Sequence, residues 1–63
     1  MEREQILNMA LLPKVKVILR NGYSYTGIIQ TVGDAVSIFI DKFGSTVLIE
    51  NSEIVGIEEV KNA

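Results

Sequence analysis

The chain has 63 residues, of which 48% are hydrophobic, contains no Cys and no His, and carries a formal net charge of −2 at pH 7. A chain of this length forms one domain and buries only about 60% of the surface that it exposes when unfolded. Domains this small usually rely on disulfides, a metal or self-association. The missing Cys and His exclude disulfides and argue against a metal, so self-association is the expected source of stability.

The charges are unevenly distributed along the chain. Residues 1–30 carry four cations and two carboxylates, a net charge of +2, whereas residues 31–63 carry two cations and six carboxylates, a net charge of −4. The acidic balance argues against a nonspecific nucleic-acid binder, because affinity for phosphates comes mostly from Lys and Arg. A local basic face is still compatible with it. In an extended strand, one side would carry Lys14, Lys16, Ile18 and Arg20, either as a solvated face or as a binding surface.

The first predicted element is a helix over residues 2–12. Glu2 and Glu4 would oppose the helix dipole in the first turn, and apolar residues recur from Ile6 at helical spacing. Pro13 ends the helix, because proline cannot continue the hydrogen-bond ladder and disfavours helical geometry in the residue before it. We expect this helix to cap a small barrel.

Residues 15–29 predict a β-hairpin. An alternating strand runs into Asn21-Gly22, and the second strand carries a glycine at Gly27. Asn-Gly between alternating apolar runs is the strongest short hairpin signal, because both central residues of a type I′ turn need positive φ. The sequence therefore predicts a type I′ turn at Asn21-Gly22.

Four strands are expected after this turn, over residues 23–32, 35–41, 45–50 and 54–60, separated by turn-forming residues. Gly56 lies inside the last of them and marks a bulge or a close backbone approach. One helix followed by five short antiparallel strands predicts a mainly β fold: a single domain over residues 1–63, with a strongly bent, SH3-like barrel over residues 14–60. The unpaired terminal strands of such a barrel invite another subunit, and we expect a closed ring.

The order of these features from Ile6 to Val60 resembles the Sm and Sm-like (LSm) family, and within it the bacterial Hfq branch most. The segment Ile6-Leu7-Asn8 looks like part of the Hfq helix, Leu19-Arg20-Asn21-Gly22 looks like that branch's first hairpin, and Gly27-Ile28-Ile29 completes the first family motif. The second motif lies over Ile49-Glu50-Asn51. The resemblance implies an Sm-like barrel in which residues 45–50 of one subunit pair with residues 54–60 of the next, closing six or seven copies into a ring.

The resemblance also implies an RNA site at the pore of the ring, at positions that match Ala35, Glu50, Asn51 and Ser52. The sequence departs from the family pattern here, because Gly33 replaces an aspartate, Ala35 has no ring to stack on a base, and Glu50 stands where the family places a cation. A ring of Glu50 carboxylates would repel phosphate. The usual uridine-binding pore site is therefore doubtful, with Asn51 as the one pore residue retained.

The opposite face matches the family better. In Hfq the residues around the first hairpin form an adenine-binding surface, and the resemblance places Tyr23 there to stack on a base and Ser24 or Thr26 to bond its edge. The expected RNA-binding residues of this hairpin face are Lys16, Ile18, Arg20, Gly22, Tyr23, Ser24, Tyr25 and Thr26. A Tyr-x-Tyr alternation is also typical of core packing, and this alternative stays open.

Nothing in the sequence assembles an active site. The serines lack a His to act as their base. Asp34 and Asp41 could pair as acid and base, but both lie in predicted turns, where Asp is favoured for turn hydrogen bonds. Gly33 and Gly44 are isolated and form no phosphate-binding loop. We therefore expect a protein that is not an enzyme and has no cofactor, metal or small-molecule substrate.

The sequence thus predicts an Sm-like, homo-oligomeric ring that binds single-stranded RNA on the hairpin face, as an RNA chaperone or scaffold. The first residues are not the basic start of a signal peptide, and no apolar run is long enough for a membrane helix, so we expect a cytoplasmic protein with no membrane partner. The alternative is an oligomeric Sm-fold module that binds protein and has lost RNA binding, which the acidic balance and Glu50 support.

Overall fold

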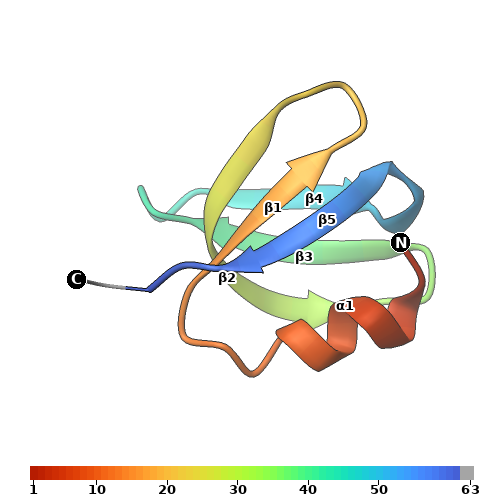
Figure 1. Cartoon of the computed structure of the whole chain (residues 1–63), viewed down its shortest axis with the longest axis horizontal. Coiled ribbons are helices and arrows are strands. Elements are labelled where there is room, and N and C mark those ends of the chain that lie inside the picture. Colours follow the sequence, from red (N-terminus) through yellow and green to blue (C-terminus); the bar gives the residue numbers. More distant parts are fainter. Residues whose placement is uncertain (62–63) are drawn as a thin grey trace.

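The structure is a computed structural model that describes residues 1–61 (Figure 1). Its elements are, in chain order, α1 (Arg3–Met9), β1 (Val15–Leu19), β2 (Ser24–Val32), β3 (Val36–Asp41), β4 (Thr46–Glu50), a 3₁₀ turn η1 (Asn51–Glu53) and β5 (Ile54–Glu59). The mainly β fold expected from the sequence is confirmed. The alternation of apolar residues placed the ends of β2 to β5 within one residue of their observed positions.

The five strands form one antiparallel sheet in the order β4-β3-β2-β1-β5. In Figure 1, β1 and β5 cross in front of β3 and β4, so the sheet bends back over a common interior. The two strands at the ends of the sheet, β4 and β5, do not pair with each other. The barrel is therefore open, and each end strand has one edge without a strand partner within residues 1–61.

The helix α1 is shorter than expected because the chain after Met9 continues in tighter turns, in which the N–H groups of Ala10 and Leu12 donate to the Leu7 and Met9 carbonyls. Glu2 and Gln5 form a capping box, in which the Glu2 backbone N–H donates to Gln5 Oε1 at 3.0 Å. The last helical residue is Met9, and residues 10–12 continue as a turn before Pro13. Ile6, 1% exposed, is the buried residue of α1 and fixes the helix to the core.

The expected type I′ turn at Asn21-Gly22 is wrong. No residue other than glycine has positive φ between residues 1 and 61, so only Gly22, with φ of 93°, is left-handed. The N–H of Gly22 donates to the Leu19 carbonyl (3.0 Å) and the N–H of Leu19 donates to the Tyr23 carbonyl (2.8 Å). These bonds close a three-residue loop, in which a type I turn is followed by a left-handed glycine.

The β3–β4 hairpin uses the same turn. Gly44 has φ of 85°, its N–H donates to the Asp41 carbonyl at 2.9 Å, and the N–H of Asp41 donates to the Ser45 carbonyl at 2.9 Å. Asp41 adds side-chain bonds, because its Oδ1 accepts from the N–H groups of Phe43 and Ser45, each at 2.9 Å. The tip of this hairpin is therefore held rigidly.

Two glycines mark places where the sheet departs from regular geometry, and the β2–β3 pairing has a further register shift between Ile29 and Thr31. A Cβ on Gly27 would lie 2.0 Å from the Ile40 carbonyl oxygen, so β2 approaches β3 more closely than any other residue would allow. Gly56 adjoins a bulge, since Ile18 pairs with Gly56 and Leu19 pairs with Ile54, which leaves Val55 without an opposite residue in β1. The expected bulge in the last strand is thus present.

The core is small and lies between the two halves of the bent sheet and α1. Its buried apolar residues are Ile6, Val15, Val17, Phe39, Ile49 and Ile54. Residues of the opposite parity, such as Lys16, Thr26 and Leu48, point outward from the same strands. We call this outward side the outer face of the sheet. Within the described part of the chain, no helix is long and apolar enough to cross a membrane.

Candidate interaction surfaces

The outer face of β1 and β2 carries part of the expected hairpin face. The register sets Lys16 opposite Thr26, and Ile18 opposite Ser24, so these four residues form two adjacent cross-strand pairs. On the other side of β1, Glu58 lies opposite Lys16. Side chains that are directly opposite lie about 5 Å apart at their Cβ atoms, so the Glu58 carboxylate reduces the positive field around Lys16.

The structure separates the two tyrosines of the hairpin. Tyr25 lies opposite the buried Val17, packs against the core, and has its ring 6.3 Å from that of Phe39 with a tilt of 58°. It therefore faces inward, away from Ser24 and Thr26, and the packing alternative describes it correctly. Tyr23 precedes β2 beside the turn glycine Gly22 and is 69% exposed, so it is the one tyrosine that is free to contact a ligand.

The structure does not bring Arg20 to the outer face with Lys16. Arg20 follows the end of β1 and its backbone N–H donates to the Glu53 carbonyl. Its guanidinium donates to the Ser52 carbonyl at 2.9 Å and lies 3.4 Å from the Glu53 carboxylate. The chain leaves the strand pleat at Arg20, so strand alternation could not predict this direction.

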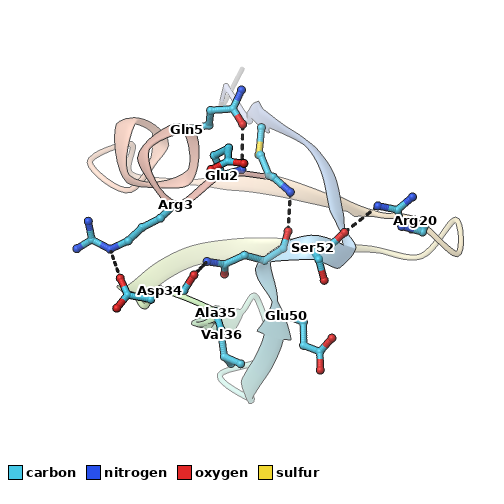
Figure 2. A pocket seen from close by; sticks show the side chains of 11 residues that line it. Glu2, Arg3, Gln5, Arg20, Asp34, Ala35, Val36, Glu50 and Ser52 are labelled. Atoms are coloured by element: carbon cyan, nitrogen blue, oxygen red, sulfur yellow. Dashed lines mark hydrogen bonds and ion pairs between the residues drawn. The ribbon is translucent and has the colours of Figure 1, made fainter.

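The residues expected at the pore surround an open hollow of about 720 Å³ beside the start of α1 (Figure 2). We call it the helix-side hollow. Ala35, Glu50, Asn51 and Ser52 all contribute to its lining, so the structure brings the expected pore residues together. Figure 2 shows Arg3 reaching Asp34 on one side of the hollow and Arg20 reaching the backbone at Ser52 on the other.

The electrostatics of the helix-side hollow do not suit a phosphate. Arg3 lies 3.4 Å from Asp34, and Arg20 lies 3.4 Å from Glu53, so each guanidinium already has a carboxylate. The exposed carboxylates of Glu2 and Glu50 also line the hollow. The Met1 ammonium, the third cation of the lining, donates to the Asn51 and Ile54 carbonyls. A chain carrying phosphates would therefore meet cations that already have partners, together with the carboxylates of Glu2 and Glu50.

Asn51 is a structural residue in this arrangement. It is 5% exposed, and its Oδ1 accepts from the Ser37 hydroxyl at 2.7 Å. Its Nδ2 donates to the carbonyls of Gly33 and Asp34 at 2.9 and 3.2 Å, and its backbone N–H donates to the Ala35 carbonyl at 2.8 Å. The side chain therefore joins the β2–β3 loop to η1 and has no polar group left for a ligand.

A second hollow, of about 350 Å³, lies on the outer face and was not found by sequence reasoning. Its lining residues are Pro13, Lys14, Gly27, Ile28, Ile40, Asp41 and Lys42. We call it the outer-face hollow. Phe43, next to Lys42 at the hairpin tip, is 83% exposed. The sequence signal that could have indicated this hollow is Lys42-Phe43, a cation beside an aromatic ring in a predicted turn. The alternation of apolar residues identifies the two only as part of a turn.

The free edges of the sheet carry exposed aliphatic side chains. Leu48, on the edge strand β4, is 69% exposed, and Val55, on the edge strand β5, is also exposed. An open groove of about 170 Å³ runs along β4, lined by residues of β4 and of the β1–β2 hairpin. Exposed apolar residues on an unpaired strand edge are unusual in a monomer.

Comparison with known proteins found no relative of this chain: no family model, no curated protein and no solved structure matches it. Within residues 1–61, no group of three or more acidic, His or Cys side chains could hold a metal ion.

Proposed function

We propose that this protein is an Sm-like, ring-forming protein that binds single-stranded RNA on the outer face of its sheet, as an RNA chaperone or scaffold. The observation that carries the proposal is the open sheet, in which β4 and β5 each keep one edge without a strand partner among residues 1–61. Native proteins usually cover such edges. A second copy of the chain offers the complementary edge, and repetition of one contact of this kind closes a ring.

The RNA-binding part of the proposal rests on the residues that remain open on the outer face. Lys16, Ser24 and Thr26 supply a cation and hydroxyl groups on neighbouring strands of this face, and Tyr23, which lies opposite Leu19 and not on this face, adds an exposed ring at the adjoining hairpin tip. Single-stranded RNA is commonly held by aromatic stacking combined with hydrogen bonds and basic side chains. The helix-side hollow is left out of the proposal because its cations, the Met1 ammonium, Arg3 and Arg20, already have partners within the chain.

The test is a titration of labelled oligo-A and oligo-U with the purified, untagged protein over a series of salt concentrations. We expect binding that weakens as salt rises. Tyr23→Ala should weaken it by about five-fold or more, the lower range for one stacked base, whereas Tyr23→Phe should keep it. Absence of binding to both oligonucleotides at low salt would show that the proposal is wrong.

A second candidate function is favoured by the acidic helix-side hollow. A ring with Glu2 and Glu50 on one face suits a basic protein segment better than RNA. Under this alternative the ring is an interaction module that no longer binds RNA. Nucleic acid that co-purifies with the protein and is removed by nuclease would exclude it, as would a Glu50→Lys variant that only strengthens an RNA affinity already present.

A further inference from the structure

The outer-face hollow and the β3–β4 turn together form a surface that the hairpin face does not include. We propose that Lys14, Lys42 and Phe43 form a nucleotide site for single-stranded RNA, in which each of the two ammonium groups binds one phosphate of the strand and the Phe43 ring stacks on a base. This inference rests on the proposed RNA-binding function and adds a second binding site for the same strand. Charge, exposure and the rigidity of the turn support it.

The charges at this hollow favour an anion. Neither Lys14 nor Lys42 forms an ion pair with any residue between 1 and 61. The one carboxylate in the lining belongs to Asp41, whose Oδ1 already accepts two backbone N–H groups. Two cations and one carboxylate that is already hydrogen-bonded give the lining of this hollow a net positive charge. Lys16 differs from Lys14 and Lys42 because Glu58 lies directly opposite it.

The backbone that carries the Phe43 ring is held in place before any ligand arrives. The N–H of Phe43 is bonded to Asp41, and the N–H of Lys42 donates to the Thr26 carbonyl at 2.7 Å, which ties the turn to β2. Lys42 Nζ lies 5.4 Å from the centre of the Phe43 ring, over one face of it. Because the ring is 83% exposed, its other face is open to a base.

The floor of the hollow is apolar and lies in line with the hairpin face. Ile28 and Ile40 are opposite each other on β2 and β3 and form this floor. Lys14 lies just before β1 and precedes Lys16 by two residues, a distance of about 7 Å along an extended chain. An RNA strand that contacts Lys16 and Thr26 can therefore continue to Lys14 and reach the β3–β4 turn without leaving the outer face.

The experiment measures the affinity of labelled oligo-A for the full chain and for single variants. Phe43→Ala should weaken binding by about five-fold or more, and Phe43→Trp should keep or improve it. Leu11→Ala is the matched control, because Leu11 is 93% exposed and lies outside the outer-face hollow. Lys42→Gln and Lys14→Gln should each lower the slope of log affinity against log salt by about 0.7, the value for one phosphate that is no longer neutralised. Arg3→Gln, which changes a cation of the helix-side hollow, should not.

The outcomes separate this inference from the function on which it rests. If the unaltered chain binds oligo-A and Phe43→Ala binds equally well, or no worse than Leu11→Ala, the nucleotide site is wrong and the proposed function stands. If the unaltered chain binds no RNA, the proposed function itself fails. If both lysine variants keep the salt slope of the unaltered chain, Lys14 and Lys42 bind no phosphate, and the proposed nucleotide site is wrong.

Discussion

At the scale of single residues, the structure divides the candidate RNA-binding residues into those that hold the fold and those that are free. Asn51, Tyr25 and Arg20 are each committed to contacts within the chain. Tyr23 and Phe43 are exposed aromatic rings at the tips of two hairpins that use the same turn. Affinity for a base should therefore depend on the two exposed rings, and stability on the committed residues.

Substitution of Asn51 tests the structural side of this division. Asn51→Ala removes the three hydrogen bonds of a buried side chain and leaves the Ser37 hydroxyl without its acceptor, so we expect a loss of about 2–4 kcal/mol in the free energy of unfolding. Urea unfolding followed by circular dichroism measures it. Asn51→Asp should also destabilise, because an oxygen would then face the carbonyls of Gly33 and Asp34.

Ser52→Ala is the matched control for Asn51, since the exposed Ser52 contributes its backbone carbonyl and not its hydroxyl to the contact with Arg20. It should change the free energy of unfolding by no more than about 0.5 kcal/mol. An Asn51→Ala variant as stable as the unaltered chain would contradict the structural role and make Asn51 a candidate ligand residue again.

At the scale of elements, local patterns predicted the strands well but not the directions of residues beside the turns. Apolar alternation fixes the ends of a strand, and an Asn-Gly or Gly signal fixes where a hairpin turns. The turn type depends on how many residues the closing hydrogen bonds span, which the Asn21-Gly22 pair does not determine. Arg20 leaves the strand pleat for that reason.

The features that the sequence could not predict, the outer-face hollow and the structural role of Asn51, depend on contacts between segments that are distant in the chain. The outer-face hollow needs the register of β1 with β2 and of β2 with β3, which brings Lys14 near Lys42. The hydrogen bonds of Asn51 likewise join the β2–β3 loop to η1 across more than a dozen residues. Its resemblance to a pore residue could not indicate that its side chain is fully occupied.

The close approach of β2 to β3 at Gly27 predicts that this glycine cannot be replaced without loss of stability. A Cβ on Gly27 would lie 2.0 Å from the Ile40 carbonyl oxygen and 2.8 Å from the Asp41 Cα, both backbone atoms that move only if the strand moves. Gly27→Ala should therefore lower the free energy of unfolding by at least about 2–3 kcal/mol or prevent folding. Thermal unfolding measures the loss.

Gly56→Ala is the matched control for Gly27, because a Cβ at Gly56 would meet only Ile18 Cδ1 at an ordinary 3.8 Å. This substitution should be neutral or stabilise the chain by up to about 1 kcal/mol, since alanine is less flexible than glycine in the unfolded chain. Equal effects of the two substitutions would mean that β2 and β3 are not as close as the structure has them.

At the scale of the whole molecule, the open sheet leaves the edge of β4 available for pairing with another copy of the chain. The bond from the Asp41 N–H to the Ser45 carbonyl sets the alternation along the β3–β4 ladder. Val47 and Ile49 therefore bond to β3, whereas the N–H groups of Thr46, Leu48 and Glu50 point to the free edge of β4. Proline at one of these free positions would remove an outward donor and leave the internal ladder intact.

Leu48→Pro should consequently block assembly without unfolding the chain. Light scattering coupled to size exclusion should give the unaltered protein a mass that is a multiple of 7.0 kDa, and the Leu48→Pro variant a mass close to a single chain with a β-type circular dichroism spectrum. Leu48→Ala, which keeps the N–H, should remain oligomeric, and Val47→Pro, which breaks the β3–β4 ladder, should unfold. An assembled Leu48→Pro variant would exclude the β4 edge from the interface, and an unaltered chain that is monomeric at micromolar concentration would contradict the ring.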